Sequence, residues 1–418
     1  MKQTNLILED REKRIDYIKT IIDKGFGAIT LRANIPGSEK RIPVAYLLVQ
    51  YYGAILNRLL SRKPLIIDGF DGPTYIYQVD AEQDYKPQMM EIEEATPLGR
   101  FIDIDVYQNS YFSKTRKLLR KCYLCDNPAF VCNKKQTHPY GELINVIEEN
   151  VYSEIQKNIT NMVKTSMMLE LDIHPKFGLV TPYSQGSHPD MDYNLMIKAQ
   201  AAIMPYLVEM FFKGLKGNDV IKLFKECREI GKLAEESMLK VTGNINAYKG
   251  LIFSLGLTLA SSGYVISRHL SFPSVFSTIK AMTVDLMQEL STPPESFGVL
   301  AYQRYGLGGA RYEAAQGYLL VQNNLASQEI SFEPASLTML LIKIIRDCQD
   351  TVLLKRAGSM ERYQYFKQLV TSIKEYDLEK ITEVTNFCIE NNISFGGSAD
   401  LLIVTIFLKL LKQTFYLH

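Results

Sequence analysis

The pattern of apolar and polar positions divides the chain into two parts near residue 140. In the first part, short runs with the period of a strand alternate with helical stretches. The predicted strands are 26–32, 74–79 and 100–107, and the predicted helices are 9–24, 43–60 and 89–94. Strands and helices mixed in this way are typical of an α+β domain.

After residue 140, apolar residues recur almost only at helical spacing. The predicted helices are 141–171, 194–214, 218–240, 248–266, 274–290, 311–322, 335–355, 377–391 and 397–413. No Pro/Gly-rich linker separates the two parts, although helix 141–171 can run across the boundary. We therefore predict an α+β domain at 1–148 and an all-α domain at 149–418.

Composition agrees with two folded domains and narrows the choice of partner. A chain of 418 residues exceeds the usual size of one domain, and 46% apolar residues supply sizeable cores. The net charge is +1, without a long run of one sign. Nucleic-acid-binding surfaces normally carry a basic excess, so the composition argues against a nucleic-acid partner.

The cysteine content and the lengths of the apolar segments indicate where in the cell the protein is located. Six cysteines are few for this length and only three of them cluster, which suggests a reducing environment rather than a disulfide framework. The N-terminal residues lack the apolar run of a secretory signal. Segment 250–267 contains three glycines and suits a buried helix, and 401–408 is shorter than the ~20 residues of a membrane span. We expect a cytoplasmic protein without a membrane partner.

Two aspartates give the clearest chemical signal in the first part. On the strand 100–107, Asp103 and Asp105 share one face because side chains alternate along a strand. Two close carboxylates suit Mg²⁺, which could neutralise a diphosphate leaving group. The alternative is an ordinary amphipathic strand with a solvated acidic face. Candidate phosphate contacts nearby in sequence are Arg32, Lys40, Arg41, Lys86 and Arg100, any of which could equally be a solvated surface charge.

A second cluster follows at Cys122, Cys125, Cys132 and His138. Three thiolates and an imidazole form a common structural Zn²⁺ set, and the Cys-x2-Cys spacing is favourable. The alternative is a group of reduced thiols in a packed loop.

The first part resembles the citrate lyase holo-acyl-carrier-protein synthase family. The resemblance covers about residues 8–148 and depends on the motifs at 35–40 and 97–106 and on the Cys/His cluster. Lys134 stands where the family often has Arg. The resemblance implies a nucleotidyltransferase-like, metal-dependent domain that transfers phosphoribosyl-dephospho-CoA to a serine and releases diphosphate. The acceptor that it implies is the apo acyl carrier protein, the gamma subunit of citrate lyase.

In the second part, residues 178–192 combine a Gly-rich loop with His188, Asp190 and Asp192. We expect Ser187 or Asp190 to cap the following helix, whose first N–H groups favour anions. Asp190 and Asp192 could hold Mg²⁺ beside a bound phosphate. His188 is a possible ligand or base, or a hydrogen-bonded structural group.

Other charged residues stand near the starts or ends of later helices, and we expect them to converge on this loop. Glu170 lies in an apolar run, where it is either a functional carboxylate with a raised pKa or a side chain turned to solvent. Three Gly-containing loops each enter a predicted helix and carry charged residues. Loop 242–250 carries Lys249, loop 305–313 carries Arg311 and Glu313, and loop 392–400 carries Asp400. Gly396, Gly397 and a capping Ser398 open the last helix, and Arg356 joins the set. The alternative for each start is ordinary helix capping.

These stretches resemble the triphosphoribosyl-dephospho-CoA synthase family across about residues 152–415. The matching motifs are 168–170, 176–180, 186–192, 249–256, 309–314, 350–351, Arg356 and 396–402. The resemblance implies that ATP and 3′-dephospho-CoA are joined with loss of adenine. The chain departs from the family pattern at Phe177, Tyr248, Tyr312, Val352 and Phe395.

The second reaction needs three kinds of group. Magnesium on Asp190 and Asp192, with Lys249, Arg311 and Arg356, would hold the triphosphate. Glu170, Glu313 or Asp400 would take the proton of the 2′-hydroxyl, and His188 or a carboxylic acid would assist departure of adenine. Two alternatives stay open: the same chemistry for the carrier protein of malonate decarboxylase, and a non-catalytic assembly factor, which Tyr248 and Val352 would favour.

Overall fold

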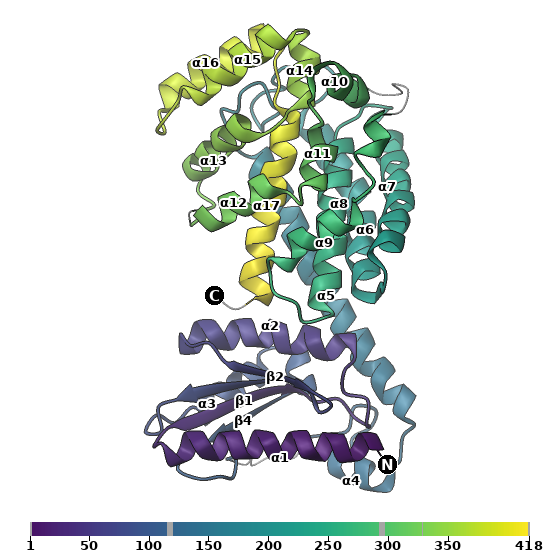
Figure 1. Cartoon of the computed structure of the whole chain (residues 1–418), viewed down its shortest axis with the longest axis vertical. Coiled ribbons are helices and arrows are strands. Elements are labelled where there is room, and N and C mark those ends of the chain that lie inside the picture. The colour runs from purple at the N-terminus through teal and green to yellow at the C-terminus, as the bar shows by residue number, and fades with distance from the viewer. Residues whose placement is uncertain (1, 115–119, 292–296, 328, 417–418) are drawn as a thin grey trace. The chain divides into compact units, whose positions relative to one another are not determined.

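The computed structural model describes residues 2–114, 120–291, 297–327 and 329–416. They divide into two compact units, each described by itself below (Figure 1). The first comprises Met1–Asn158 with Ile266–His269 and Lys412–His418, and the second comprises Ile159–Val265 with Leu270–Leu411. The division falls within helix α5 (Tyr140–Leu171), so that helix contributes to both units.

The first unit is an α+β fold built on a four-stranded antiparallel sheet in the order β2-β3-β1-β4. Its strands are β1 (Gly27–Ala33), β2 (Leu65–Gly69), β3 (Gly72–Val79) and β4 (Ile102–Tyr107). Its helices are α1 (Lys2–Asp23), α2 (Pro43–Leu60), α3 (Lys86–Glu94), the 3-10 turn η1 (Pro97–Phe101) and α4 (Ala129–Lys135). The predicted strands and helices are confirmed, whereas β2 and α4 were not predicted. Strand β2 is largely exposed at the sheet edge, so it lacks the alternating apolar pattern.

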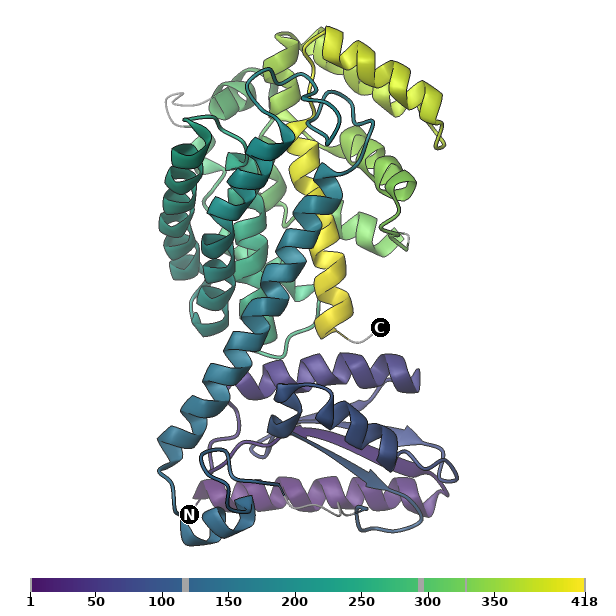
Figure 2. The ribbon, with the colours of Figure 1, turned by 180° about the vertical axis from the view of Figure 1, so that it is seen from behind.

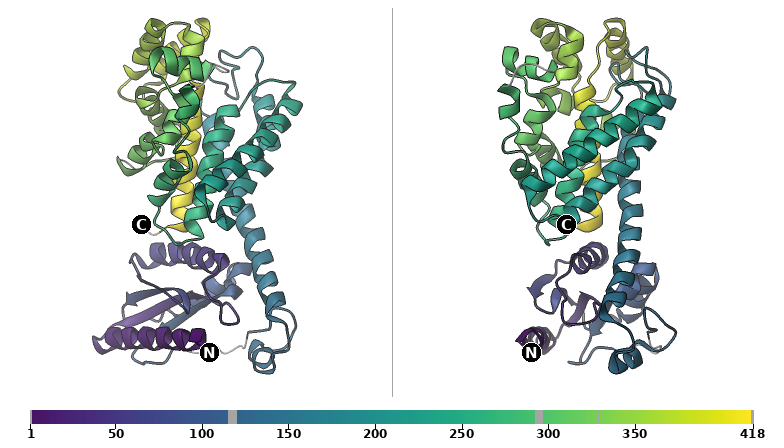
Figure 3. Two further views of the ribbon diagram at one scale, coloured as in Figure 1. Left: turned by 45° about the vertical axis from the view of Figure 1, so that its right-hand side comes forward. Right: turned by 90° about the vertical axis from the view of Figure 1, so that its right-hand side faces the viewer.

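The two faces of this sheet differ in chemistry. In the register of β1 with β4, Arg32 pairs with Asp103 and Thr30 with Asp105, so these side chains share one face. Helix α1 covers the apolar part of that face, where Ile18 packs with Ile76. Helix α2 covers the opposite face, as the views in Figures 1 and 3 show. The face under α1 therefore combines an apolar cluster with a patch of charged side chains.

The named elements of the second unit are all helices among its described residues. Besides α5 its helices are α6 (Tyr193–Lys216), α7 (Val220–Thr242), α8 (Lys249–Ile266), α9 (Ser274–Met282), η2 (Gln288–Ser291), α10 (Phe297–Tyr305), α11 (Gly309–Ala315), α12 (Leu319–Ser327), α13 (Pro334–Asp347), α14 (Thr351–Ala357), α15 (Met360–Thr371), α16 (Leu378–Glu390) and α17 (Gly396–Phe415). The all-α prediction is confirmed, but α10 and α15 were not predicted.

Three long predicted helices are in fact broken. The segment 274–290 contains only α9, which ends at Met282, and the short η2. The segment 311–322 divides into α11 and α12 at Gly317, which has a positive φ of 67° and so leaves helical geometry. The segment 335–355 divides into α13 and α14, because Asp350 caps a new helix with its side chain. The last of these breaks places the start of α14 against Gly396 and Gly397 at the start of α17.

Helix α17 forms the interior of the helical unit. Residues 401–408 are almost completely buried, and the helix runs through the bundle in Figures 2 and 3. Two other helices, α6 and α8, have the length and hydropathy of a membrane span. In α8, 78% of the most apolar 18-residue stretch is buried inside the structure, as expected for a core helix. In α6, 44% of the corresponding stretch is buried.

Candidate active sites

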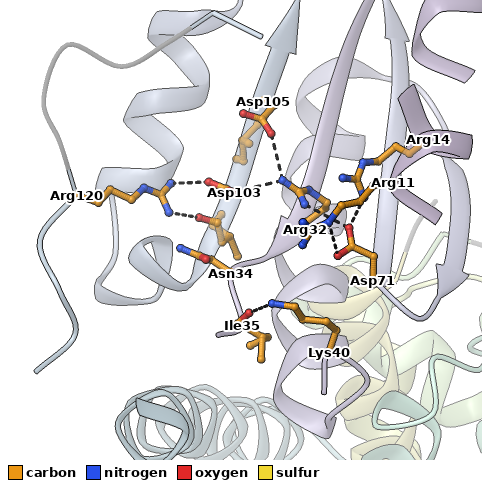
Figure 4. Close-up of polar contacts among 12 residues, drawn as sticks. Arg11, Arg14, Arg32, Asn34, Ile35, Lys40, Asp71, Asp103, Asp105 and Arg120 are labelled. Atoms are coloured by element: carbon orange, nitrogen blue, oxygen red, sulfur yellow. Dashed lines mark hydrogen bonds and ion pairs between the residues drawn. The ribbon is translucent and has the colours of Figure 1, made fainter. Parts of the chain in front are cut away.

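The aspartate pair of the first unit lies on the polar face of the sheet, as the strand pattern predicts. Ile102, Ile104 and Val106 are buried, while Asp103 and Asp105 between them stay partly exposed. Arg32 bridges the pair, with Nη2 at 3.5 Å from Asp103 Oδ2 and 3.4 Å from Asp105 Oδ2 (Figure 4). Arg32 was a candidate phosphate contact; the structure instead pairs it with aspartates.

Sequence reasoning missed most of the ion-pair network around these carboxylates. Arg120 lies 2.7 Å from Glu93 Oε1 and 3.4 Å from Asp103 Oδ1. On the other side of Arg32, Asp71 forms ion pairs with Arg14 and Arg11. Arg14 Nη1 lies 2.6 Å from Asp71 Oδ2, and Arg11 Nε lies 3.0 Å from Asp71 Oδ1 (Figure 4). No local pattern links these residues, because α1, α3 and the β2–β3 turn supply them from distant parts of the sequence.

The aspartate pair fits a divalent cation. The arginine contacts to Asp103 and Asp105 are 3.4–3.5 Å long, beyond the 2.7–2.9 Å of a charge-assisted hydrogen bond, so both carboxylates keep acceptor capacity. Burial, followed by the neighbouring charge of Asp105, raises the pKa of Asp103. A cation would relieve both effects.

A cavity of about 1520 Å³ opens beside this network. Its lining includes two predicted phosphate contacts, Lys40 and Arg100, together with Arg120. Burial lowers the pKa of Lys40 to about 8, and its ammonium group donates to the carbonyl of Ile35 (Figure 4). The aspartates do not line the cavity, but Arg120 contacts both the cavity and Asp103. The cavity thus offers cationic walls next to a carboxylate pair.

The predicted Cys/His cluster is assembled in the structure. The Sγ atoms of Cys122, Cys125 and Cys132 and a ring nitrogen of His138 all lie within 4.8 Å of one another. Among the described residues this is the one group of three or more Cys, His, Asp or Glu side chains arranged to hold a metal ion. Asp190 and Asp192 belong to no such group.

In the helical unit, the Gly-rich loop packs against the turn that precedes α17. Gly178 has a positive φ of 76°, and any Cβ there would collide with the carbonyl of Ile393. Ser187 Oγ donates to that same carbonyl at 2.6 Å. The loop and the start of the last helix, more than 200 residues apart in sequence, are therefore held together as predicted.

Within this contact the buried His188 pairs with the partly exposed Arg356. Arg356 Nη2 donates to His188 Nδ1 at 2.7 Å, and His188 Nε2 lies 2.8 Å from Ser394 Oγ. Since arginine only donates, Nδ1 is the acceptor and Nε2 carries the proton. Burial, with Arg356 second, lowers the pKa of His188 to about 4. The imidazole is therefore neutral near pH 7 and is poorly suited to protonate adenine.

The capping predictions for two helices are wrong. Asp192, not Ser187 or Asp190, caps α6, since its carboxylate accepts from Leu195 N at 2.7 Å. Asp190 is exposed, and its charge acts on both His188 and Arg356. One aspartate thus caps the helix while the other points to solvent beside an arginine.

The second error concerns Ser398, which does not cap α17. Its hydroxyl and backbone N–H donate to Asp350 Oδ2 at 2.9 and 2.8 Å. The other oxygen of Asp350 accepts from Val352 N and Leu353 N at the start of α14. Asp350 therefore ties two helix N-termini together, a role that sequence alone did not reveal.

Asp400 lies in the second turn of α17, and its carboxylate lies beside the start of a third helix, α8. Gly250, at the first turn of α8, leaves room for this carboxylate, because a Cβ there would collide with Asp400 Oδ2 unless the side chain moved. Asp400 forms no hydrogen bond or ion pair with the described residues. Burial, then the charges of Asp350 and Glu170, raises its pKa well above the ordinary value. Asp400 is thus a partly exposed, unpaired carboxylate in an acidic neighbourhood.

Glu170 is buried rather than turned to solvent. Its Oε1 accepts from Lys176 Nζ at 2.8 Å, and Lys176 is only 1% exposed. Tyr248, a departure from the family pattern, is also buried here and accepts a hydrogen bond from Gln200 at 2.9 Å. The ion pair therefore neutralises one of the acids that surround Asp400.

Glu313 is a second buried acid, on α11. Burial raises its pKa to about 7, opposed by a hydrogen bond from the backbone of Gln349 and by the charge of Lys367. Sequence reasoning missed Lys367, which donates to the carbonyl of Cys348 at 2.7 Å. A carboxyl group with a pKa near 7 can exchange protons at physiological pH.

Two predicted phosphate ligands are not drawn into this cluster. Lys249 forms an ion pair with Glu235 on α7 and is 61% exposed. Arg311 is partly exposed and forms no hydrogen bond or ion pair within the described part of the chain. Gly396 lies against Val352 and Gly397 against Asp350, so the start of α17 does contact the start of α14.

Comparison with known proteins gives both units a family. The model of the ATP:dephospho-CoA triphosphoribosyl transferase family matches residues 156–417. The model of the apo-citrate lyase phosphoribosyl-dephospho-CoA transferase family matches residues 2–154. The chain is therefore a bifunctional transferase, with one activity in each matched segment.

Curated relatives match either most of the chain or its C-terminal part. Protein CitXG of Leuconostoc mesenteroides subsp. cremoris is 29% identical over 447 aligned positions, which cover 96% of each chain. Protein CitXG of Haemophilus influenzae is 30% identical over 80% of this chain and 78% of its own. A probable 2-(5''-triphosphoribosyl)-3'-dephosphocoenzyme-A synthase of Photobacterium profundum is 32% identical over 62% of this chain and 88% of its own.

The chain belongs to the CitXG family. Its two reactions make the citrate lyase prosthetic group from ATP and dephospho-CoA and attach it to apo-citrate lyase. The resemblances inferred from the motifs of both halves are confirmed.

Proposed function

We propose that each reaction has its own site, one around Asp400 in the helical domain at 149–418 and one around Asp103 in the α+β domain at 1–148. The observation that carries the first assignment is the unpaired, partly exposed carboxylate of Asp400 beside the start of α8. The six free cysteines support the expectation of a cytoplasmic, reducing location.

In the helical domain, Asp400 takes the proton of the 2′-hydroxyl of 3′-dephospho-CoA. The hydroxyl oxygen then bonds to the ribose carbon of ATP as the bond to adenine breaks. Burial among Asp350 and Glu170 makes Asp400 a stronger base than an exposed aspartate. Glu313, with a pKa of about 7, is the acid that supplies a proton to adenine.

Arg356 and Arg311 face the triphosphate. His188 and Asn392 orient Arg356, whose Nη1 donates to Asn392 Oδ1 at 2.8 Å. We assign His188 to this positioning role. Asp190 and the free oxygen of Asp192 would hold Mg²⁺, which when bound neutralises phosphate charge. Lys249 joins the site only if its ion pair with Glu235 opens.

In the α+β domain, which acts in the manner of a nucleotidyltransferase, the acceptor is a serine of the apo acyl carrier protein, the gamma subunit of citrate lyase. Its hydroxyl oxygen bonds to phosphorus as the bond to diphosphate breaks. Asp103 and Asp105 would hold Mg²⁺, which when bound stabilises negative charge on the phosphates. Lys40 and Arg100 on the cavity wall bind the leaving diphosphate.

Separable variants test the two assignments. Asp400→Asn should stop release of adenine from ATP and dephospho-CoA but still label the carrier protein when the triphosphoribosyl intermediate is supplied. Asp103→Asn should do the reverse. Thr405→Ser, a buried substitution one turn beyond Asp400, serves as the control for α17. If either aspartate variant retains both activities, or loses both while folded, the assignment is wrong.

A further inference from the structure

The Cys/His cluster has the dimensions of a tetrahedral metal site. Cys125 Sγ lies 3.5 Å from Cys132 Sγ and 3.3 Å from His138 Nε2. Zn–S bonds of about 2.3 Å and Zn–N bonds of about 2.0 Å place tetrahedral ligand atoms roughly 3.5–3.8 Å apart. The sulfur separation is far longer than a disulfide bond, and all three cysteines are free.

Backbone hydrogen bonds bring the four ligands close to one another. The turn that carries Cys122 and Cys125 closes with a hydrogen bond from Cys122 N to Asn127 O at 2.8 Å. After α4, Gln136 takes a left-handed conformation with φ 48°, and Thr137 N returns to Cys132 O. This reversal brings His138 back beside the thiols. The site is thus built by local structure rather than by chance contact.

We propose that this cluster binds one Zn²⁺ as a structural ion. Three thiolates and one imidazole complete a tetrahedral shell and leave no position for substrate. Binding displaces the three thiol protons into solvent. The ion has no chemical step of its own and acts by fixing residues 122–138.

The loop that zinc fixes is a wall of the α+β cavity. Cys122, Cys125, Cys132 and His138 all line it, together with Arg100. Arg100 Nη2 donates to the carbonyl of Cys122 at 2.9 Å, and its guanidinium lies 5.3 Å above the Tyr123 ring. Zinc therefore positions Arg100 toward the diphosphate, an inference that rests on the proposed function of the cavity.

Metal content tests the site on the full-length chain. Protein purified from zinc-supplemented cells should contain about one zinc per chain by mass spectrometry. Cys125→Ser and Cys132→Ser should lose most of it, whereas Cys227→Ala, at a buried cysteine in α7, should retain it. Cobalt substitution should give the visible spectrum of a tetrahedral thiolate site. Wild-type protein without zinc, or Cys132→Ser with full zinc, would overturn the site.

Kinetics test the positioning role. Removal of zinc from wild-type protein by a zinc-selective chelator, with Mg²⁺ kept in excess, should raise the KM for the triphosphoribosyl intermediate in carrier labelling roughly tenfold, as loss of a ligand-orienting shell does, and added zinc should restore it. Adenine release should not change. In Arg100→Ala, zinc should still bind but chelation should no longer alter KM. An equal KM effect in that variant would refute the positioning role, while failure of wild-type labelling would refute the cavity's function and leave the zinc result intact.

Discussion

Replacement of Glu313 by Gln should stabilise the protein at pH 8 and at the same time impair adenine release. Glu313 is 5% exposed, and burial raises its pKa from 4.5 to about 7. A carboxyl group whose pKa is higher in the folded state destabilises that state once it ionises. Stability is therefore lost as pH rises from about 4.5 to about 7, and the loss is complete above the folded pKa.

The size of this effect follows from the shift. A change of about 2.5 pKa units corresponds to about 3 kcal/mol at 1.36 kcal/mol per unit. Glutamine keeps the shape and can still accept the hydrogen bond from Gln349, but it carries no charge. At pH 8 the variant should therefore gain up to about 3 kcal/mol, or roughly 6–12 °C in the transition of the helical unit. At pH 5, where folded wild-type Glu313 is largely protonated, the difference should shrink to about 1 kcal/mol or less.

Scanning calorimetry at pH 5 and pH 8 measures the stability difference, and chromatography of free adenine measures activity. The rate of adenine release should fall about 100-fold or more if Glu313 supplies a proton. Glu383→Gln, at an exposed position on α16, is the matched control and should change neither quantity. A variant that is less stable than wild type at pH 8, or equally shifted at both pH values, would refute the reasoning.

Three further predictions follow from the geometry. Gly250→Ala should reduce adenine release at least tenfold, because the new methyl group displaces the Asp400 carboxylate, while carrier labelling with supplied intermediate is unchanged; normal release would contradict that packing. The kcat/KM of carrier labelling should fall as pH rises through about 8, since the charge of Lys40 is present below its pKa and lost above it, and Lys40→Arg should flatten this limb; an unchanged profile would exclude Lys40. Asp350→Asn should lower the thermal midpoint of the helical unit by several degrees, as an amide cannot accept all four hydrogen bonds; an unchanged midpoint would show that the tie contributes little.

Local sequence pattern was sufficient wherever the functional feature is itself local. The alternation around Asp103 and Asp105 predicted a strand with both carboxylates on one face, and the structure has that arrangement. The Cys/His spacing likewise predicted a cluster that the structure assembles within 17 residues of chain. In both cases backbone periodicity or a short turn determines which side chains meet.

The rest of each site depends on tertiary contacts that no periodicity encodes. Arg120 reaches Glu93 across 27 residues, and Asp350 reaches Ser398 across 48. The sequence does not show whether a capping aspartate such as Asp350 contacts the start of one helix or of two. Ser398 was therefore assigned as a cap of its own helix, whereas it donates to Asp350. Breaks such as that at Gly317 were also missed, because the apolar pattern continues across them.

The most direct test of the account is release of adenine by the Asp400→Asn variant in the presence of ATP, 3′-dephospho-CoA and Mg²⁺. The predicted result is loss of adenine release of at least 100-fold in a folded protein that still transfers supplied triphosphoribosyl intermediate to the carrier protein. Adenine release at the wild-type rate would contradict the assignment of Asp400 as the base at the start of α8.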